Sequence, residues 1–209
     1  RWLIHLHTDL DLNNYPSILS HINKYKEIIL TRNYDSGELT KARNLKKWWA
    51  LSSSRKDFDF FKPKIVSPQR SYVNTFGYTK KEWLASGDVY FITQKDKEFD
   101  LKFILSLLNS KLYFFWLFHK GKRKGNMLEL YLTPLSEIPI KVAAENMQQK
   151  FALLADKIID GKKNEEDTVV LEHQVDIMVC KLYELTYEEV LIVDEAFAMS
   201  EMEYNNFEL

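Results

Sequence analysis

The chain has 209 residues, of which 45% are hydrophobic and 28% charged, which excludes a disordered or collagen-like protein. Its longest apolar run, at residues 112–119, is far shorter than the roughly 20 residues of a membrane span, so we expect a soluble, cytoplasmic protein without a membrane partner. Cys180 is the only cysteine, which excludes an internal disulfide. The length suits one domain with an appendage, and the start at Arg1 suggests a piece of a longer protein.

The net charge of −1 conceals two oppositely charged parts. Residues 1–140 carry 23 Lys and Arg against 14 Asp and Glu, a net charge of +9, whereas residues 141–209 carry 6 against 16, a net charge of −10. This asymmetry is typical of a body that binds a polyanion and has an acidic appendage, although an unevenly charged solvated surface explains it equally well. We therefore expect one domain at 1–140 and an acidic helical extension at 141–209.

The first elements are a strand and a helix. Weak alternation at residues 1–7 indicates an opening strand. Residues 16–29 begin with proline and repeat Ile and Leu every three or four positions, which indicates one amphipathic helix. Residues 34–61 are loop-like and hold large aromatics. Among these, Trp48 and Trp49 are predicted framework residues, and core packing of at least one is favoured.

Three short strands are expected next. The run at 64–68 ends in a proline, the run at 88–93 is the clearer strand, and residues 70–76 suggest another that ends at the glycine turn of Gly77. Residues 101–116 then repeat apolar side chains with helical period, although Asn109 and Ser110 interrupt the pattern, so two helices that meet there remain an alternative.

A glycine-flanked loop is expected at residues 120–125, followed by a strand at 128–132. Pro134 and Pro139 are expected to interrupt secondary structure in the segment after it.

Beyond residue 141 the pattern is helical. Apolar residues repeat with helical spacing at 147–158 and again at 171–182. Thr186 and Glu189 form a capping box for a last short helix, and the tail from Ala198 has little to bury, so we expect it to be loose. The predicted fold is α+β: a mixed β-sheet domain with packed helices, followed by a helical C-terminal extension.

The sequence lacks the strings that usually carry catalysis. It contains no GxGxxG, P-loop, HExxH or GxSxG string, and His5 and His7 lack further ligands for a metal. It also lacks an Asn-Pro-Pro-Tyr string to hold a flipped base and a glycine-rich cofactor turn. We therefore predict no catalytic residue, no metal and no cofactor in this chain.

Cationic and amide side chains instead favour DNA binding. Cations surrounding two glycines are candidates for phosphate contacts, with a solvated basic turn as the alternative; they are Lys120, Lys122, Arg123 and Lys124. Arginine pairs with guanine, and Asn or Gln with adenine. The candidates for reading bases are Gln69, Arg70, Ser71 and Asn74, for which capping and turn formation are the alternative.

Several strings occur in a characteristic order over about residues 10–140. They are YPSI at 15–18, WWAL at 48–51, PKIVSP at 63–68, SGDVYFI at 86–92, LLNSK at 107–111, GKRKG at 121–125 and ELY at 129–131. Together they resemble the TaqI-like C-terminal specificity domain, the target recognition domain of adenine-specific DNA methyltransferases and of fused type II restriction enzymes. The string LYELT at 182–186 resembles the helical tail of these enzymes, in which a glycine is usual at the position of Glu184.

The resemblance implies that this chain recognises a specific sequence in double-stranded DNA and is not itself an enzyme. An N-terminal methyltransferase domain of the same polypeptide, in some members joined to an endonuclease, would methylate adenine at N6 with S-adenosylmethionine. The phosphate contacts that carry over are Lys64, Lys111, Lys122, Arg123 and Lys124, and the framework positions include Asp88, Asn109 and Ser110. Helix capping by Asn109 and Ser110, and loop anchoring by Asp88, remain structural alternatives.

Two other classes of function stay open. The first is a protein-interaction or scaffolding domain that docks through its acidic helices and does not bind DNA. The second, which has least support because no acid–base pair can be placed, is an enzyme with an unrecognised site.

Overall fold

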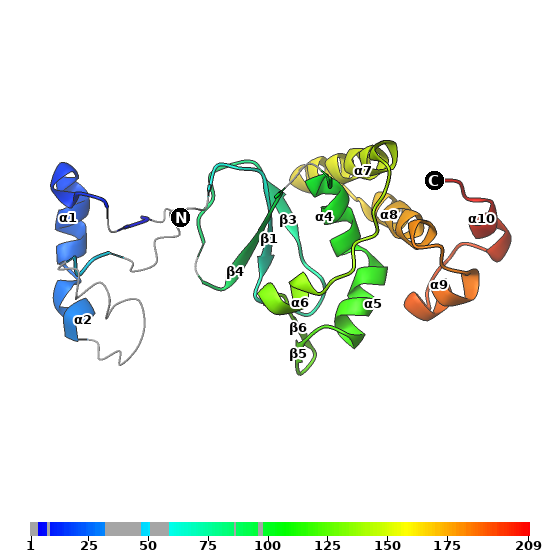
Figure 1. Ribbon diagram of the computed structural model, residues 1–209, viewed down its shortest axis with the longest axis horizontal. Coiled ribbons are helices and arrows are strands. Elements are labelled where there is room, and N and C mark those ends of the chain that lie inside the picture. The colour runs from blue at the N-terminus through cyan, green and yellow to red at the C-terminus, as the bar shows by residue number, and fades with distance from the viewer. Residues whose placement is uncertain (1–3, 8, 32–46, 51–58, 86, 96–97) are drawn as a thin grey trace. The chain divides into compact units, whose positions relative to one another are not determined.

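A computed structural model describes residues 4–7, 9–31, 47–50, 59–85, 87–95 and 98–209. The chain forms two compact units, Arg1–Phe60 and Phe61–Leu209 (Figure 1). The predicted α+β class is confirmed, because helices and small antiparallel sheets make up the second unit. The predicted division into a domain at 1–140 and an acidic extension at 141–209 falls inside the second unit. It stays a prediction that these two parts have different functions.

The described secondary structure of the first unit is mainly helical. A short 3-10 helix, Leu12–Asn14, is capped by the Asp11 carboxylate, which accepts the Asn13 N–H at 3.0 Å. The single helix predicted at 16–29 is instead two helices, α1 (Pro16–Asn23) and α2 (Lys26–Thr31). The break follows Asn23, a weak helix former. Of the predicted opening strand, residues 1–3 lie outside the described residues, and His7 forms an isolated bridge.

Two three-stranded antiparallel sheets organise the second unit (Figure 1). In the first, β1 (Lys64–Pro68) lies between β3 (Gly77–Thr79) and β4 (Val89–Thr93). In the second, β6 (Met127–Glu129) lies between β2 (Arg70–Ser71) and β5 (Arg123–Lys124). The strands predicted at 64–68 and 88–93 are therefore confirmed.

The strand predicted at residues 70–76 is wrong, because only its first two residues pair, and Gly77 begins a strand rather than ending one. The side chain of Asn74 explains the interruption. Its amide donates to the carbonyls of Leu108 at 2.7 Å and Ser110 at 2.8 Å. These bonds fasten the loop between β2 and β3 to the helices instead of to a neighbouring strand.

The central helices are α4 (Leu101–Asn109) and α5 (Lys111–His119), as the two-helix alternative predicted. Ser110 separates them, and its hydroxyl caps α5 by accepting the Tyr113 N–H at 3.4 Å. Within the described part of the chain, no single helix has the length and apolar content of a membrane span. The α4–α5 pair, bent by 66°, meets that test only when its two helices are joined.

Three further helices surround this centre: α6 (Leu132–Ser136), α7 (Glu145–Lys163) and α8 (Val169–Leu182). Phe103 of α4 and Phe151 of α7 are fully buried, with ring centroids 5.3 Å apart. The interruption of secondary structure predicted at Pro134 is wrong. This proline lies in the first turn of α6, where a missing N–H costs no helical hydrogen bond.

The C-terminal residues fold as two short helices, α9 (Tyr187–Val193) and α10 (Glu201–Asn206). The capping box of Thr186 and Glu189 is present as predicted. The prediction of a loose tail is wrong: Ser200 and Glu203 form a second capping box, and Tyr204 is 1% exposed. Its hydroxyl donates to the Leu185 carbonyl at 2.9 Å, which ties α10 to the end of α8.

Candidate nucleic-acid interface

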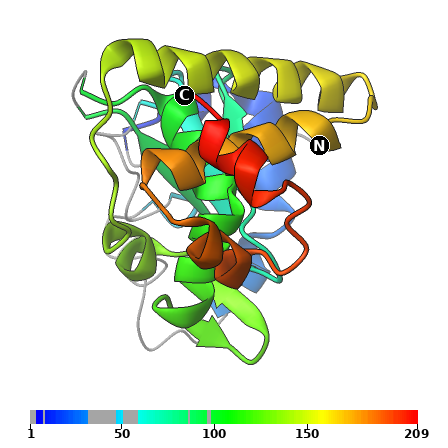
Figure 2. The same ribbon diagram turned by 90° about the vertical axis from the view of Figure 1, so that its right-hand side faces the viewer.

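The basic segment predicted as a loop at residues 120–125 forms part of a β-hairpin. Lys124 and Met127 pair across a two-residue turn in which Gly125 has φ +61°. A glycine in this conformation at the first turn position is typical of the tight turns that join twisted strands. The hairpin and α7 lie at opposite ends of the second unit (Figures 1 and 2). The basic tip therefore lies at the end of the unit away from α7.

Aromatic rings hold two of the hairpin cations. The guanidinium of Arg123 lies 4.1 Å from the ring centroid of Phe118, and the ammonium of Lys122 lies 5.4 Å from that of Tyr131, both within cation–π range. Hydrogen bonding to Tyr131, aided by the negative charge of Glu129, raises the pKa of Lys122. Lys120, Lys122, Arg123 and Lys124 are all exposed, so the hairpin and the α5 end before it present a group of cations to solvent.

A row of three charged residues crosses the second sheet. Arg70 and Glu129 are register partners, and the Glu129 N–H donates to the Lys122 carbonyl at 2.8 Å. The Arg70 Nε donates to Glu129 Oε1 at 3.1 Å, and Lys122 Nζ lies 3.9 Å from Glu129 Oε2. The carboxylate, whose side chain is 10% exposed, thus lies between two cations on neighbouring strands.

The backbone of Gln69 joins the two sheets. Its N–H donates to the Asp88 carbonyl at 2.7 Å, and its carbonyl accepts the Leu130 N–H at 2.8 Å. The Gln69 and Ser71 side chains are half-buried, and Ser71 Oγ lies 2.8 Å from Thr75 Oγ1. The structure therefore brings the candidates Arg70 and Ser71, on the strand that pairs with β6, and Gln69 just before that strand next to the basic hairpin.

Sequence reasoning missed four residues of this surface. Tyr72 and Val73 follow β2 and are largely exposed, whereas Glu129 and Tyr131 contact Lys122 as described above. A usable signal was present for Glu129, because it is the only acidic residue between positions 101 and 136. The signal for Tyr72 and Val73 was weaker. It is the presence of large side chains in a polar turn, where they have no core to join and are exposed.

Two predicted contact residues are placed within the framework instead. Lys64 is 0% exposed, and its ammonium donates to the carbonyls of Lys62 at 3.1 Å and Lys81 at 3.0 Å. A buried ammonium with such partners offers no surface to a phosphate. Asn74 is half-buried and directs its amide to the α4–α5 junction, as described above. We therefore leave Lys64 and Asn74 out of the candidate interface.

Lys111 lies at the start of α5, whereas the hairpin follows the end of that helix. Its ammonium pairs with Asp194 at 2.5 Å, and its backbone N–H donates to the Asp176 carboxylate at 2.8 Å. Burial raises the pKa of Asp176 to about 6, against the opposing effect of the Lys111 hydrogen bond. Lys111 thus joins the α5 terminus to acidic groups of α8 and the α9 end, not to the hairpin cations.

The remaining predicted positions are structural. The Asn109 amide exchanges two hydrogen bonds of 3.0 Å with the backbone of Phe76. Asp88 supplies the carbonyl that Gln69 contacts. Trp48 and Trp49, in the first unit, are half-buried, with the ammonium groups of Lys26 and Lys47 each 5.6 Å from a ring centroid.

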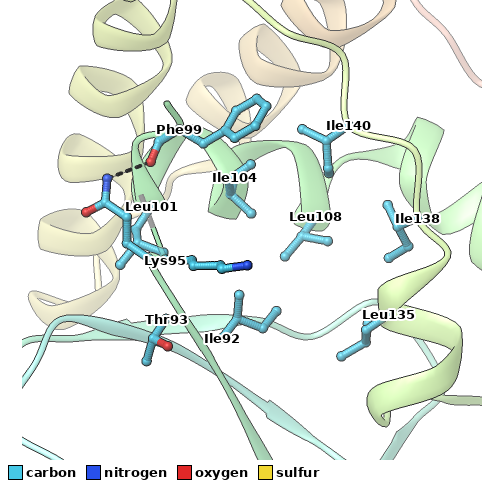
Figure 3. Close-up of a pocket in the computed structure, with 11 residues that line it drawn as sticks. Ile92, Thr93, Lys95, Phe99, Leu101, Ile104, Leu108, Leu135, Ile138 and Ile140 are labelled. Atoms are coloured by element: carbon cyan, nitrogen blue, oxygen red, sulfur yellow. Dashed lines mark hydrogen bonds between the residues drawn. The ribbon is translucent and has the colours of Figure 1, made fainter. Parts of the chain in front are cut away.

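Two features of the described residues bear on metal binding and on the contents of one cavity. Among them, no group of three His, Cys, Asp or Glu residues could hold a metal ion. A cavity of about 250 Å³ lies between β4, α4 and α6 (Figure 3). Its walls are largely apolar, and Lys95 is the one titratable side chain among the lining residues, so it holds no acid–base pair. Its lining includes Ile92, Leu101, Ile104, Leu108, Leu135 and Ile138.

Comparisons with known proteins agree with this architecture. The profile of the TaqI-like C-terminal specificity domain matches residues 20–140. Type II methyltransferase M.HindII of Haemophilus influenzae is 26% identical over 144 residues, which cover 65% of this chain and 26% of that protein. The Type IIL restriction-modification enzyme MmeI, solved in complex with DNA, shares the fold with a TM-score of 0.62 at 14% identity, over 94% of this chain and 28% of MmeI. The chain spans only about a quarter of each of these two proteins.

Proposed function

The chain belongs to the TaqI-like C-terminal specificity domain family, and on this premise we propose that it recognises a specific sequence in double-stranded DNA. One observation carries the proposal: the exposed cations Lys122, Arg123 and Lys124 of the hairpin, preceded by Lys120 at the end of α5, lie beside Arg70 in the same sheet. The candidates for phosphate binding and for base reading are thus next to each other, an arrangement that supports sequence-specific DNA binding.

The shape of the hairpin supports a place in the major groove. That groove is about 12 Å wide and admits a two-stranded β-ribbon. With β5 and β6 in the groove, the lysines of the hairpin contact the flanking phosphates. Arg70, on the neighbouring strand, and Gln69, just before it, face the base edges, and Tyr72 adds an apolar contact.

The parent protein, we further propose, is a type II restriction-modification methyltransferase that modifies adenine at N6. In this proposal an N-terminal domain of the same polypeptide binds S-adenosylmethionine and performs the transfer, while the present chain selects the site. One fact supports it: the chain covers about a quarter of the methyltransferase M.HindII. An endonuclease in the same polypeptide remains part of the prediction.

Fluorescence anisotropy of the full chain with a labelled random duplex tests DNA binding. We expect affinity to fall steeply as the salt concentration rises, because each phosphate contact releases bound counterions. Replacing Lys122, Arg123 and Lys124 with alanine should weaken binding to all sequences and lower the slope of log K against log salt by up to about 3. Absence of binding by the unmodified chain at low salt would contradict the proposal.

A matched variant controls for net charge. Lys150, Lys157 and Lys163 lie on α7, at the other end of the unit from the hairpin (Figure 2). Replacing these three with alanine removes the same charge and should change affinity much less than the hairpin variant. Equal losses for the two variants would show that net charge, rather than the hairpin, governs binding.

A further inference from the structure

Glu129 stands out within the proposed interface, because it is the only acidic residue between positions 101 and 136 and lies among the hairpin cations. Its side chain is 10% exposed. Removing a carboxylate from water is costly, and a negative charge near DNA phosphates opposes binding. Neither effect favours a glutamate here, so the reason for its presence lies in its partners.

The principal partner of Glu129 is Arg70. The Nε of Arg70 donates to Oε1 of Glu129 at 3.1 Å, within a cross-strand pair of β2 and β6. Arginine has five N–H groups in a planar fork. Because the Nε–H is occupied, the terminal nitrogens remain for an end-on pair of hydrogen bonds, the geometry that matches O6 and N7 of guanine.

The surroundings of this ion pair fix the direction of the arginine. Glu129 is held by β6 between Arg70 and Lys122, whereas the Arg70 side chain is 38% exposed. The carboxylate is therefore an anchor inside the protein, and the arginine extends from it to solvent. A side chain ordered before binding loses less conformational entropy when it meets its target.

We propose that Glu129 is a positioning residue, which holds the Arg70 guanidinium for a guanine in the major groove and so sets a preference for a G·C pair at one position of the target site. This inference rests on the proposed function, DNA recognition. Glu129 acts through Arg70 and does not itself contact the DNA.

Selection from a randomised duplex pool by the full chain tests the inference. The unmodified protein should enrich one position in G·C. In Glu129→Gln the acceptor oxygen and the shape are kept but the charge is lost. We expect the preference at that one position to fall about 5- to 100-fold, the range of a bidentate base contact, while affinity for random duplex stays equal or rises.

Three comparisons separate positioning from a structural role. Arg70→Ala should abolish the same preference, and adding Glu129→Gln to it should have no further effect, because the two residues act as one unit. Replacing the selected guanine with 7-deazaguanine, which lacks N7, should weaken binding of the unmodified chain but not of Arg70→Ala. Glu137→Gln, which removes an equal charge from an exposed position, should leave the preference unchanged.

The possible outcomes are distinct. If the unmodified chain shows no salt-dependent binding to duplex DNA, the proposed function fails, and this inference fails with it. If the chain binds but enriches no G·C position, or if Glu129→Gln keeps the full preference, the inference alone is overturned. Loss of preference at every position, together with a lower melting temperature, would mean that Glu129 stabilises the fold, which also overturns it.

Discussion

Glu184 Oε1 lies 2.6 Å from Lys141 Nζ, at the end of α8, where the backbone of Glu184 adopts φ +60°. The Leu185 N–H donates to the Cys180 carbonyl at 3.1 Å, the pattern of a helix C-cap that glycine normally terminates. A side chain in this left-handed conformation is strained, because its Cβ crowds the backbone. In the enzyme tails that this segment resembles, a glycine is usual at this position.

Glu184→Gly should therefore stabilise the protein, since it relieves the backbone strain and removes only an ion pair of an exposed glutamate. We expect the melting temperature to rise by about 2–4 °C, as measured by thermal denaturation. Glu184→Ala is the control, because it removes the ion pair and keeps the strained conformation. A lower melting temperature for the glycine variant would show that the ion pair dominates.

Asp176 should make stability depend on pH in the direction opposite to most carboxylates. Burial raises its pKa to about 6 from a usual value of 3.8, so the folded protein binds this proton more tightly than the unfolded chain does. The contribution of Asp176 to stability is therefore greatest below about pH 4 and is lost as the pH rises to above 6. The difference amounts to about 2–3 kcal/mol.

Asp176→Asn isolates this contribution. The asparagine oxygen can still accept the Lys111 N–H but does not ionise. Urea unfolding between pH 4.5 and 8 should show the variant gaining stability relative to the unmodified protein as the pH rises. Parallel pH profiles would contradict the raised pKa.

Gly125→Ala should disturb the basic hairpin. No atom lies within 4 Å of an added Cβ, but the φ of +61° disfavours any side chain. We expect the free energy of unfolding to fall by about 1 kcal/mol and DNA affinity to fall with it, as the turn moves the hairpin cations. Gly87→Ala is the matched control, because its Cβ also meets no atom and its φ is not positive. Equal effects of the two changes would argue against a special role for the turn.

The burial of Tyr204 predicts that α10 contributes to stability. Tyr204→Ala should lower the free energy of unfolding by about 3–5 kcal/mol through loss of packing, and Tyr204→Phe by about 1 kcal/mol through loss of the bond to Leu185. Urea denaturation measures both. Met202→Ala, at a position that is 72% exposed, should change little. A small effect of Tyr204→Ala would mean that α10 is only loosely attached.

The elements predicted well from sequence are those whose signals are local. Apolar runs bounded by turns located β1 and β4, and the Thr186–Glu189 pair located the start of α9. The same kind of signal, Ser200 followed by Glu203, was available for α10. This signal was missed because the tail has few apolar residues to suggest a packed helix. Tyr204 is the buried residue of α10 that attaches the helix.

The errors at Asn74 and Lys64 have a different cause. Both side chains satisfy backbone carbonyls remote from their own strands or turns, Asn74 at the α4–α5 junction and Lys64 at Lys81. Such bonds depend on tertiary structure and leave no periodic trace in the sequence. The pairing of Arg70 with Glu129, 59 residues apart, escaped prediction for the same reason.

The main-chain connection between the two sheets at Gln69 affects which substitutions the domain can accept during evolution. Both hydrogen bonds of this connection use main-chain atoms, which every residue except proline supplies in the same way. Substitutions at Gln69 and the adjacent positions of β2 therefore change side chains while the two sheets stay connected. Under the proposed function, descendants of this protein would acquire new target sites by point mutation, without rebuilding the scaffold that holds the hairpin.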